Sequence, residues 1–186
     1  MEETLRQQPS NSIKICLFGP ESSGKSTLSR KLSQHYNAPL VPEYAREYLQ
    51  KLWDSTQKIC RPKDLLPIAA GQIQLENKAI ATNPPLVICD TDLLTTKVYS
   101  EAYYDGWCPE LLTKYAIKNT YDLYLLTYID TPWQADDLRD RPERRQEMFD
   151  HFKNALEHNK RPYILLRGTV EERMELATKT INQLLL

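Results

Sequence analysis

Continuous apolar runs recur along the chain, and each run is bounded by polar residues, proline or glycine. An apolar run that does not alternate with polar positions is typical of a parallel strand buried on both faces. The segments between the runs carry apolar residues three and four positions apart, which predicts amphipathic helices. The runs predict strands at residues 13–18, 86–89, 123–128 and 162–166, with a short extended piece at residues 38–42.

The predicted helices alternate with the predicted strands. They cover residues 28–36, 43–52, 65–81, 93–104, 109–119, a stretch ending near 158, and 171–186. This alternation predicts an α/β fold of three layers, with a five-stranded parallel sheet between helices on both faces. We expect a flexible N-terminal lead-in at residues 1–12 and a single domain at residues 13–186, with a mobile lid at about residues 131–146.

The first predicted strand leads into a glycine- and serine-rich loop, which opens onto a helix. From Gly19 to Ser26 the loop reads G-x-x-x-x-G-K-[ST], the P-loop pattern of nucleoside triphosphatases in its strand–loop–helix context. Glycines let backbone N–H groups turn toward phosphate oxygens, and the helix N-terminus adds positive charge. We expect Lys25 to reach the outer phosphates in catalysis and Ser26 to bind Mg²⁺. The residues expected to bind ATP are Gly19, Glu21, Ser22, Ser23, Gly24, Lys25, Ser26 and Thr27.

Composition and charge narrow the classes of partner. The formal net charge is −1, so the chain lacks the excess of basic residues that would predict a nucleic-acid partner. No apolar run approaches the roughly 20 residues of a membrane helix, and the polar N-terminus is unlike a signal peptide. The four cysteines lack C-x-x-C spacing, so we expect small buried hydrophobes, not metal ligands or disulfides. These features predict a cytoplasmic protein.

Two aspartates follow the strand predicted at residues 86–89. A carboxylate at the end of a strand beside the phosphate loop can hold Mg²⁺. We expect Asp90 to be the metal ligand, and Asp92 to face the substrate as a catalytic and binding residue. The alternative is that one of the two caps the helix that follows.

Glu43 and Arg46 follow the short extended piece, on the side where a phosphate acceptor would lie. A carboxylate there could take the proton of the acceptor hydroxyl, so either Glu43 or Asp92 is the candidate base. Arg46 could bind the acceptor or steady the transferring phosphate. A surface ion pair of little energetic value is the alternative for Glu43 and Arg46.

The most charged part of the chain lies at residues 136–145, after the fourth strand. Arginines carried by a closing loop can stabilise the charge of a migrating phosphoryl group. Arg139 and Arg144 are the best candidates for this catalytic role. A solvated, self-paired charge run is the alternative.

Aromatic residues near strand ends are candidates for stacking on a substrate heterocycle. Trp133 and Tyr104 are the expected substrate-binding residues, although a place in the core is as plausible for the tyrosine. Gly168 follows the last strand, where the base of the nucleotide is expected to rest.

Several of these segments together resemble the bacterial ribosylnicotinamide kinases, a family that includes the kinase domain of NadR-type regulators of NAD biosynthesis. The resemblance runs from about residue 13 to the last strand. It rests on the phosphate loop, on Pro-Glu-Tyr-Ala-Arg-Glu-Tyr at 42–48, on Asp-Thr-Asp at 90–92, and on Asp-Thr-Pro-Trp at 130–133 with Asp-Asp-Leu-Arg at 136–139.

This resemblance implies transfer of the γ-phosphoryl group of ATP to the 5′-hydroxyl of nicotinamide riboside, a small-molecule nucleoside, giving nicotinamide mononucleotide. The chain length leaves no room for the helix-turn-helix and nucleotidyltransferase domains of the regulators, so we expect neither operator binding nor NAD synthesis. Asp137 stands where glycine is common in the family, which bears on the conformation of the lid and on substrate choice.

Two other functions fit the sequence. A deoxynucleoside or nucleotide kinase would also place a carboxylate after the second strand. A regulatory P-loop ATPase module would bind nucleotide without phosphorylating an acceptor. A GTP switch is disfavoured, because the segment Asn-Lys-Ala-Ile at 77–80 lacks the aspartate that reads guanine.

Overall fold

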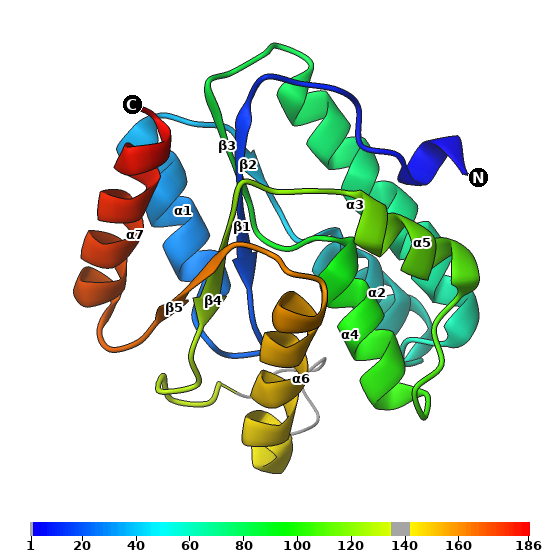
Figure 1. Ribbon diagram of the computed structural model, residues 1–186. Helices are drawn as coiled ribbons and strands as arrows, with labels where there is room; N and C mark the ends of the chain where they lie inside the picture. Colours follow the sequence, from blue (N-terminus) through cyan, green and yellow to red (C-terminus); the bar gives the residue numbers. More distant parts are fainter. Residues whose placement is uncertain (1, 135–141) are drawn as a thin grey trace.

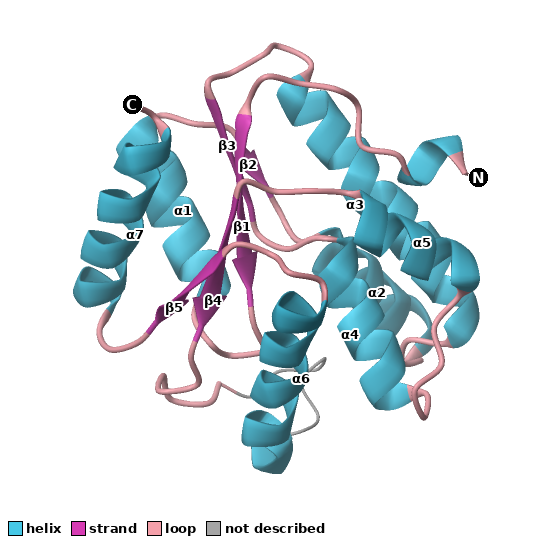
Figure 2. Ribbon diagram, in the orientation of Figure 1, coloured by secondary structure: helices cyan, strands magenta, loops and turns pink. Residues whose placement is uncertain are grey.

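A computed structural model describes residues 2–134 and 142–186, and its centre is a five-stranded parallel sheet (Figures 1 and 2). The strands lie in the order β2, β3, β1, β4, β5. Their bounds are β1 Ile13–Phe18, β2 Leu40–Val41, β3 Leu86–Cys89, β4 Leu123–Thr127 and β5 Tyr163–Leu166. The strand number and the parallel pairing confirm the sheet predicted from the apolar runs.

Strand β1 occupies the middle of the sheet, where both of its edges are paired. Cys16 lies opposite Cys89 of β3 on one side and opposite Tyr124 of β4 on the other. The chain leaves β1 toward β2 and β3, and then crosses to β4 and β5 on the other side. Ligands bind outside the carboxyl ends of parallel strands where the strand order reverses in this way. The loop after β1 lies at this position.

Helices cover both faces of the sheet (Figure 1). On one face lie α1 (Lys25–Tyr36) and α7 (Val170–Leu184), which contact each other. The other face is covered by α3 (Leu65–Ile80), α4 (Leu93–Tyr103), α5 (Glu110–Lys118) and α6 (Arg145–His158), while α2 (Tyr44–Thr56) packs on α3. Short 3-10 helices lie at Glu3–Leu5, Pro62–Asp64 and Pro142–Arg144. The three predicted layers are confirmed.

Alternate side chains of β1 supply two apolar cores. Ile15 and Leu17 pack into the core on the side of α1 and α7. Phe18 belongs to the core on the opposite face, where its ring meets Phe152 of α6 edge-on at 4.8 Å between centroids. Each large apolar side chain buried in this way contributes about 1.5–3 kcal/mol. These cores hold the strand ends, and thus the loops that follow them, in fixed positions.

The N-terminal segment differs from the expected flexible lead-in, because it packs against the domain. Leu5 is fully buried in the larger core, and its carbonyl accepts a hydrogen bond from Asn119 Nδ2. Gln7 donates from Nε2 to the buried carboxylate of Glu76 on α3. Tyr121 donates to the same carboxylate at 2.6 Å. A single buried leucine and polar side-chain contacts hold this segment, and neither produces a periodic pattern in the sequence.

Helix α2 extends to Thr56, four residues further than predicted, and ends where Gln57 adopts a left-handed conformation with φ of 54°.

Among residues 2–134 and 142–186, no helix is both long and apolar enough to cross a bilayer. All four cysteines are free thiols, and Cys16 and Cys89 are buried in the sheet.

Candidate active site

A cleft of about 610 Å³ opens at the carboxyl ends of the strands. The phosphate loop after β1 forms one wall, and residues of α2, α3 and α4 form the other. Volumes of this size are typical of sites for small molecules and cofactors. Of the predicted site residues, the cleft is lined by Glu21, Ser22, Ser23, Gly24, Lys25, Ser26, Thr27, Glu43, Arg46 and Tyr104.

Two glycines shape the phosphate loop. Gly19 has φ of 141°, and a Cβ there would lie 2.6 Å from Thr127 Oγ1 of β4. Gly24 has φ of 88° and caps α1 without a side-chain hydrogen bond, so the first N–H groups of α1 are not covered by a capping side chain. Open helix N-termini of this kind bind anions. The ammonium of Lys25 is largely buried and donates to the carbonyl of Pro20 at 2.7 Å.

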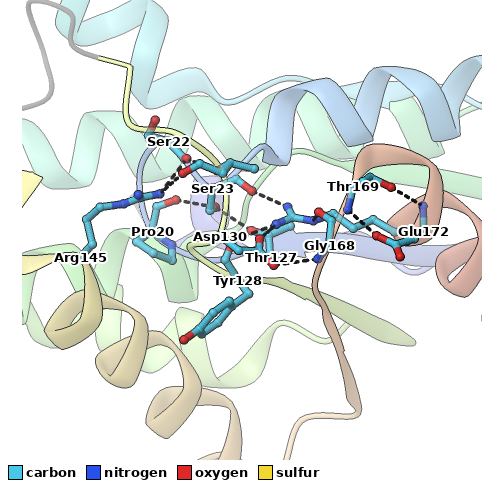
Figure 3. Close-up of polar contacts among 12 residues, drawn as sticks. Pro20, Ser22, Ser23, Thr127, Tyr128, Asp130, Arg145, Gly168, Thr169 and Glu172 are labelled. Carbon is cyan, nitrogen blue, oxygen red and sulfur yellow. Dashed lines mark hydrogen bonds and ion pairs between the residues drawn. The ribbon is translucent and has the colours of Figure 1, made fainter.

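The phosphate loop is fastened to β4 and α7 through Ser23 (Figure 3). The Ser23 hydroxyl lies 2.6 Å from Thr127 Oγ1 and donates to the carbonyl of Pro20 at 2.7 Å. The Ser23 carbonyl accepts from Arg173 Nη1 at 2.6 Å. These contacts hold the phosphate loop against β4 and α7.

Arg173 of α7 is a site residue that sequence reasoning missed. It is 2% exposed and lines the cleft. Its guanidinium donates to the carbonyls of Gly168 and Tyr128, both at 3.1 Å, and forms an ion pair with Asp130. The sequence signal was available, because Arg173 lies four and eight residues before the buried Ala177 and Ile181 of the same helix. An arginine on a helix's apolar stripe is a candidate for buried hydrogen bonding.

A second arginine, Arg145, ties the start of α6 to the phosphate loop. Its Nη2 donates to the carbonyl of Thr131 at 2.9 Å and to that of Ser22 at 3.3 Å. Thr131 in turn donates from its hydroxyl to the Ser22 carbonyl at 2.6 Å. The guanidinium carbon lies 5.7 Å from the centre of the Trp133 ring, a cation–π geometry. Figure 3 shows Arg145 reaching Ser22 from α6.

Trp133, Gly168 and Arg144 are predicted site residues that do not line the main cleft. Trp133 lies in a small separate hollow with Arg145 and Tyr103, and its stacking on substrate stays a prediction. Gly168 donates from its N–H to Asp130 at 2.7 Å and serves the loop-fastening network instead of contacting the cleft. Arg144 is exposed and forms an ion pair with Glu147.

The other lid candidates fall in the segment between Gln134 and Pro142. Arg139 and Asp137 lie outside the described residues. Of the lid expected at about residues 131–146, the structure describes the two stems, 131–134 and 142–146.

Asp90 lies at the end of β3, 5% exposed, behind the phosphate loop. Burial raises the pKa of its carboxyl from 3.8 to about 6, the negative charge of Glu43 adds to the increase, and the Ser26 hydroxyl and Lys25 ammonium oppose it. Its Oδ1 atom is buried and has no hydrogen-bond partner among the described residues. A buried carboxylate oxygen without a partner, beside a serine hydroxyl, fits a divalent cation.

The donor set at this place suits Mg²⁺. No group of three or more His, Cys, Asp or Glu residues that could hold a metal occurs in the described parts of the chain. Mg²⁺ commonly uses one or two carboxylates together with substrate phosphates and water. Ser26 and Asp90 would supply such a donor set, and the metal site stays a prediction.

Asp92 does not line the cleft, and its contacts are those of the predicted alternative, a helix cap. Its side chain is 1% exposed and caps α4 by accepting from the N–H of Thr95 at 2.8 Å. Its other oxygen accepts from the hydroxyl of Tyr124 at 2.8 Å. Burial raises the pKa of this carboxyl. Asp92 thus caps α4, and of the two candidate bases Glu43 is the one that lines the cleft.

The wall opposite the phosphate loop carries the predicted acceptor residues. Glu43 stands at the N-cap position of α2, but its side chain makes no capping hydrogen bond and lines the cleft. Tyr104 lines the same cleft and donates from its hydroxyl to the carbonyl of Cys60 at 2.9 Å. Burial raises the pKa of Tyr104 to about 12, so the phenol stays protonated. Tyr99 and Tyr103, from α4, also line this wall.

The chain is 32% identical over 128 residues to the trifunctional NAD biosynthesis/regulator protein NadR of Salmonella typhimurium. This match covers 67% of the chain but 30% of that protein, so the chain spans about a third of the curated relative.

Solved structures share the fold. The NadR protein in complex with NR superposes with a TM-score of 0.75 at 25% identity, over 92% of this chain and 51% of that chain. A deoxyadenosine kinase from M. mycoides gives a TM-score of 0.68 at 19% identity, over 92% of this chain and 100% of that chain. The fold is therefore that of the P-loop kinases.

The AAA domain family matches residues 14–173, most of the chain, and the chain belongs to this family.

Proposed function

We propose that the chain is an ATP- and Mg²⁺-dependent kinase that phosphorylates the 5′-hydroxyl of nicotinamide riboside to give nicotinamide mononucleotide. One observation carries the proposal: a single cleft joins the phosphate loop to a second wall that presents Glu43 and Arg46. A phosphate donor and a hydroxyl acceptor must meet in this way for phosphoryl transfer. The likeness to NadR, whose structure in complex with NR has the same fold, supports the choice of acceptor.

On the donor side, the loop's N–H groups and Lys25 would hold the phosphates of ATP. Ser26 and Asp90 would hold Mg²⁺, which when bound neutralises negative charge on those phosphates. Arg173 keeps the loop in position through the Ser23 carbonyl. These groups act by positioning and by electrostatics, which supply most of the catalysis of phosphoryl transfer.

On the acceptor side, Glu43 would take the proton of the attacking hydroxyl, and Arg46 would steady the phosphoryl group. The rings of Tyr99, Tyr103 and Tyr104 provide flat apolar surface for the base of a nucleoside. Arg139 keeps its proposed role as a lid cation.

Four free cysteines fit a reducing compartment, so we place the reaction in the cytoplasm.

The proposal is tested by incubating the purified chain with Mg-ATP and a panel of nucleosides while ADP release is measured. We expect ADP release that depends on nicotinamide riboside, with nicotinamide mononucleotide as the product identified by mass spectrometry. Slow ADP release that no nucleoside stimulates would overturn the proposal and favour a regulatory ATPase module.

A deoxynucleoside or nucleotide kinase is the second candidate. The shared fold with the deoxyadenosine kinase from M. mycoides motivates its inclusion. The same panel separates the two functions, because preferential phosphorylation of deoxyadenosine, deoxycytidine or thymidine would select the second candidate.

A further inference from the structure

Helix α2 carries the candidate base, Glu43, at its N-cap position. No residue of α2 is fully buried, so packing alone constrains this helix weakly. One tie is a hydrogen bond from the Tyr48 hydroxyl to Asp64 Oδ1 at 3.2 Å, one turn into the helix. The position of Glu43 therefore depends on what holds the two residues beside it.

A single side chain on α3 holds both of those neighbours. Gln72 is 2% exposed, and its Oε1 accepts from the N–H of Tyr44 at 2.9 Å. Its Nε2 donates to the carbonyl of Pro42 at 3.3 Å. The amide of Gln72 thus binds the backbone immediately before and immediately after Glu43. A buried amide with both ends bonded in this way has one orientation.

The residue next to Gln72 contributes a second, independent contact. A Cβ atom at Gly71 would overlap the ring of Tyr44, so the absence of a side chain lets that ring lie against the backbone of α3. Gly71 is not in a left-handed conformation, and a helix interior disfavours glycine by about 1 kcal/mol relative to alanine. Close approach of Tyr44 is the physical reason for glycine at this position.

Glu43 is left facing the cleft by this arrangement. An acidic residue at an N-cap ordinarily accepts a hydrogen bond from its own helix, which Glu43 does not do. With residues 42 and 44 held by Gln72, Glu43 lines the same cleft as Lys25.

We propose that Gln72 is a positioning residue for phosphoryl transfer. It holds Glu43 at the acceptor hydroxyl by binding the backbone on both sides of Glu43. Gly71 leaves room for the Tyr44 ring, which packs against α3 beside this contact. This inference rests on the proposed kinase function and on Glu43 as its base. A purely structural role for Gln72, as a buried amide that stabilises α3 against α2, is the competing explanation.

The test compares substitutions in two backgrounds, the natural chain and Glu43→Gln. Gln72→Leu removes both hydrogen bonds at similar volume, and Gln72→Glu keeps the acceptor for Tyr44 but loses the donor to Pro42. Gln74→Leu, at an exposed position of the same helix, is the matched control. The measured quantities are kcat and the KM values for nicotinamide riboside and Mg-ATP, with thermal melting as a check on folding.

We expect Gln72→Leu to lower kcat about 10- to 100-fold in the natural background, because small misplacements of a reacting group have effects of this size. The KM for Mg-ATP should stay unchanged, and Gln74→Leu should match the natural chain. In the Glu43→Gln background, Gln72→Leu should have little further effect, since residues that act through one another are not additive. Gly71→Ala, which displaces Tyr44, should reproduce this pattern and serves if Gln72→Leu fails to fold.

Equal losses in both backgrounds would assign Gln72 the structural role and overturn the inference. Full activity of Gln72→Leu, or of Glu43→Gln, would also overturn it, while phosphorylation by the natural chain would leave the proposed function standing. Absence of any nucleoside-dependent phosphorylation by the natural chain is the distinct result that removes the proposed function, and this inference with it.

Discussion

Arg173 and Ser23 lie 150 residues apart in the sequence, yet the Arg173 guanidinium donates to the Ser23 carbonyl at 2.6 Å. The last helix of the chain thus holds the loop that follows the first strand. The same guanidinium also binds Gly168, Tyr128 and Asp130, so one buried side chain joins the loops after β1, β4 and β5. The shape of the phosphate loop is therefore a property of the whole domain.

Replacement of Arg173 by methionine is expected to weaken both the fold and nucleotide binding. The substitution leaves several acceptors unpaired and Asp130 without its ion-pair partner, so we expect a loss of about 2–4 kcal/mol in the free energy of unfolding. Urea denaturation measures this loss, and calorimetric titration with a non-hydrolysable ATP analogue measures affinity. Lys179→Met, at an exposed position of the same helix, is the control. Unchanged affinity in Arg173→Met would show that the loop holds its shape without this contact.

At neutral pH, and in the absence of nucleotide and metal, Asp90→Asn is expected to increase the free energy of unfolding of the protein. The pKa of Asp90 is raised from 3.8 to about 6, so the folded protein holds this proton more tightly than the unfolded chain does. The stabilisation from that proton is complete below about pH 3.8 and is lost as the pH rises through about 6. Asparagine stays neutral, so its advantage should grow by about 1–3 kcal/mol between pH 4.5 and pH 7.5.

Urea denaturation across this pH range measures the difference for Asp90→Asn. The same variant should lose Mg²⁺-dependent turnover, because the carboxylate that suits the cation is removed. A stability difference that is constant with pH would contradict the assignment of the raised pKa to Asp90.

Substitutions at the two candidate bases, Asp92 and Glu43, are expected to have different effects on turnover. Asp92→Asn keeps a good N-cap and a partner for the Tyr124 hydroxyl, so turnover should stay near that of the natural chain. Asp92→Ala should cost about 2–4 kcal/mol of stability by removing the cap and leaving Tyr124 unpaired. Glu43→Gln should lower kcat by about 10²- to 10⁴-fold while the protein remains folded. Steady-state kinetics and thermal melting of the three variants decide, and a large kcat loss in Asp92→Asn would return that residue to the site.

Arg145→Met is expected to raise the KM for Mg-ATP, while Arg144→Met leaves it unchanged. Arg145 binds the carbonyls of Ser22 and Thr131, and loss of one to two such hydrogen bonds is worth about 1–2 kcal/mol, or a 5- to 30-fold change. Arg144 is exposed and paired with Glu147, where an ion pair contributes little. Initial-rate kinetics with varied ATP make the comparison, and a large kcat loss in Arg144→Met would restore its predicted role in the lid.

The sheet and its helices could be predicted because the positions that are buried in the structure are the apolar positions of the sequence. Buried strands such as β3 give continuous apolar runs, and the helices give repeats of three and four. Leu5 escaped this reasoning because one buried leucine in a polar segment has no period to detect. Helix boundaries shifted for a similar reason, since α2 continues through polar residues at its exposed end.

Within the site, motif reasoning located the phosphate loop but could not orient the side chains around it. Asp90 and Asp92 are two positions apart, and only the backbone between them decides that one lies behind Ser26 and the other caps α4. Thr91, between them, has φ of 132°, a conformation that propensity would not predict for a threonine. Arg144 and Arg145 differ by one position at the start of a helix, which turns one toward solvent and the other toward the loop.

The buried N-terminal segment changes where the folded unit begins. A boundary drawn from the phosphate-loop pattern would start at Ile13 and discard Leu5 and Gln7. A chain shortened in this way would open a hole in the core on the α3 face and remove one donor from the carboxylate of Glu76. The phosphate loop lies at the other end of the strands, so the damage would reach it only through global instability. Shortened versions that fail to bind ATP would therefore say nothing about the phosphate loop itself.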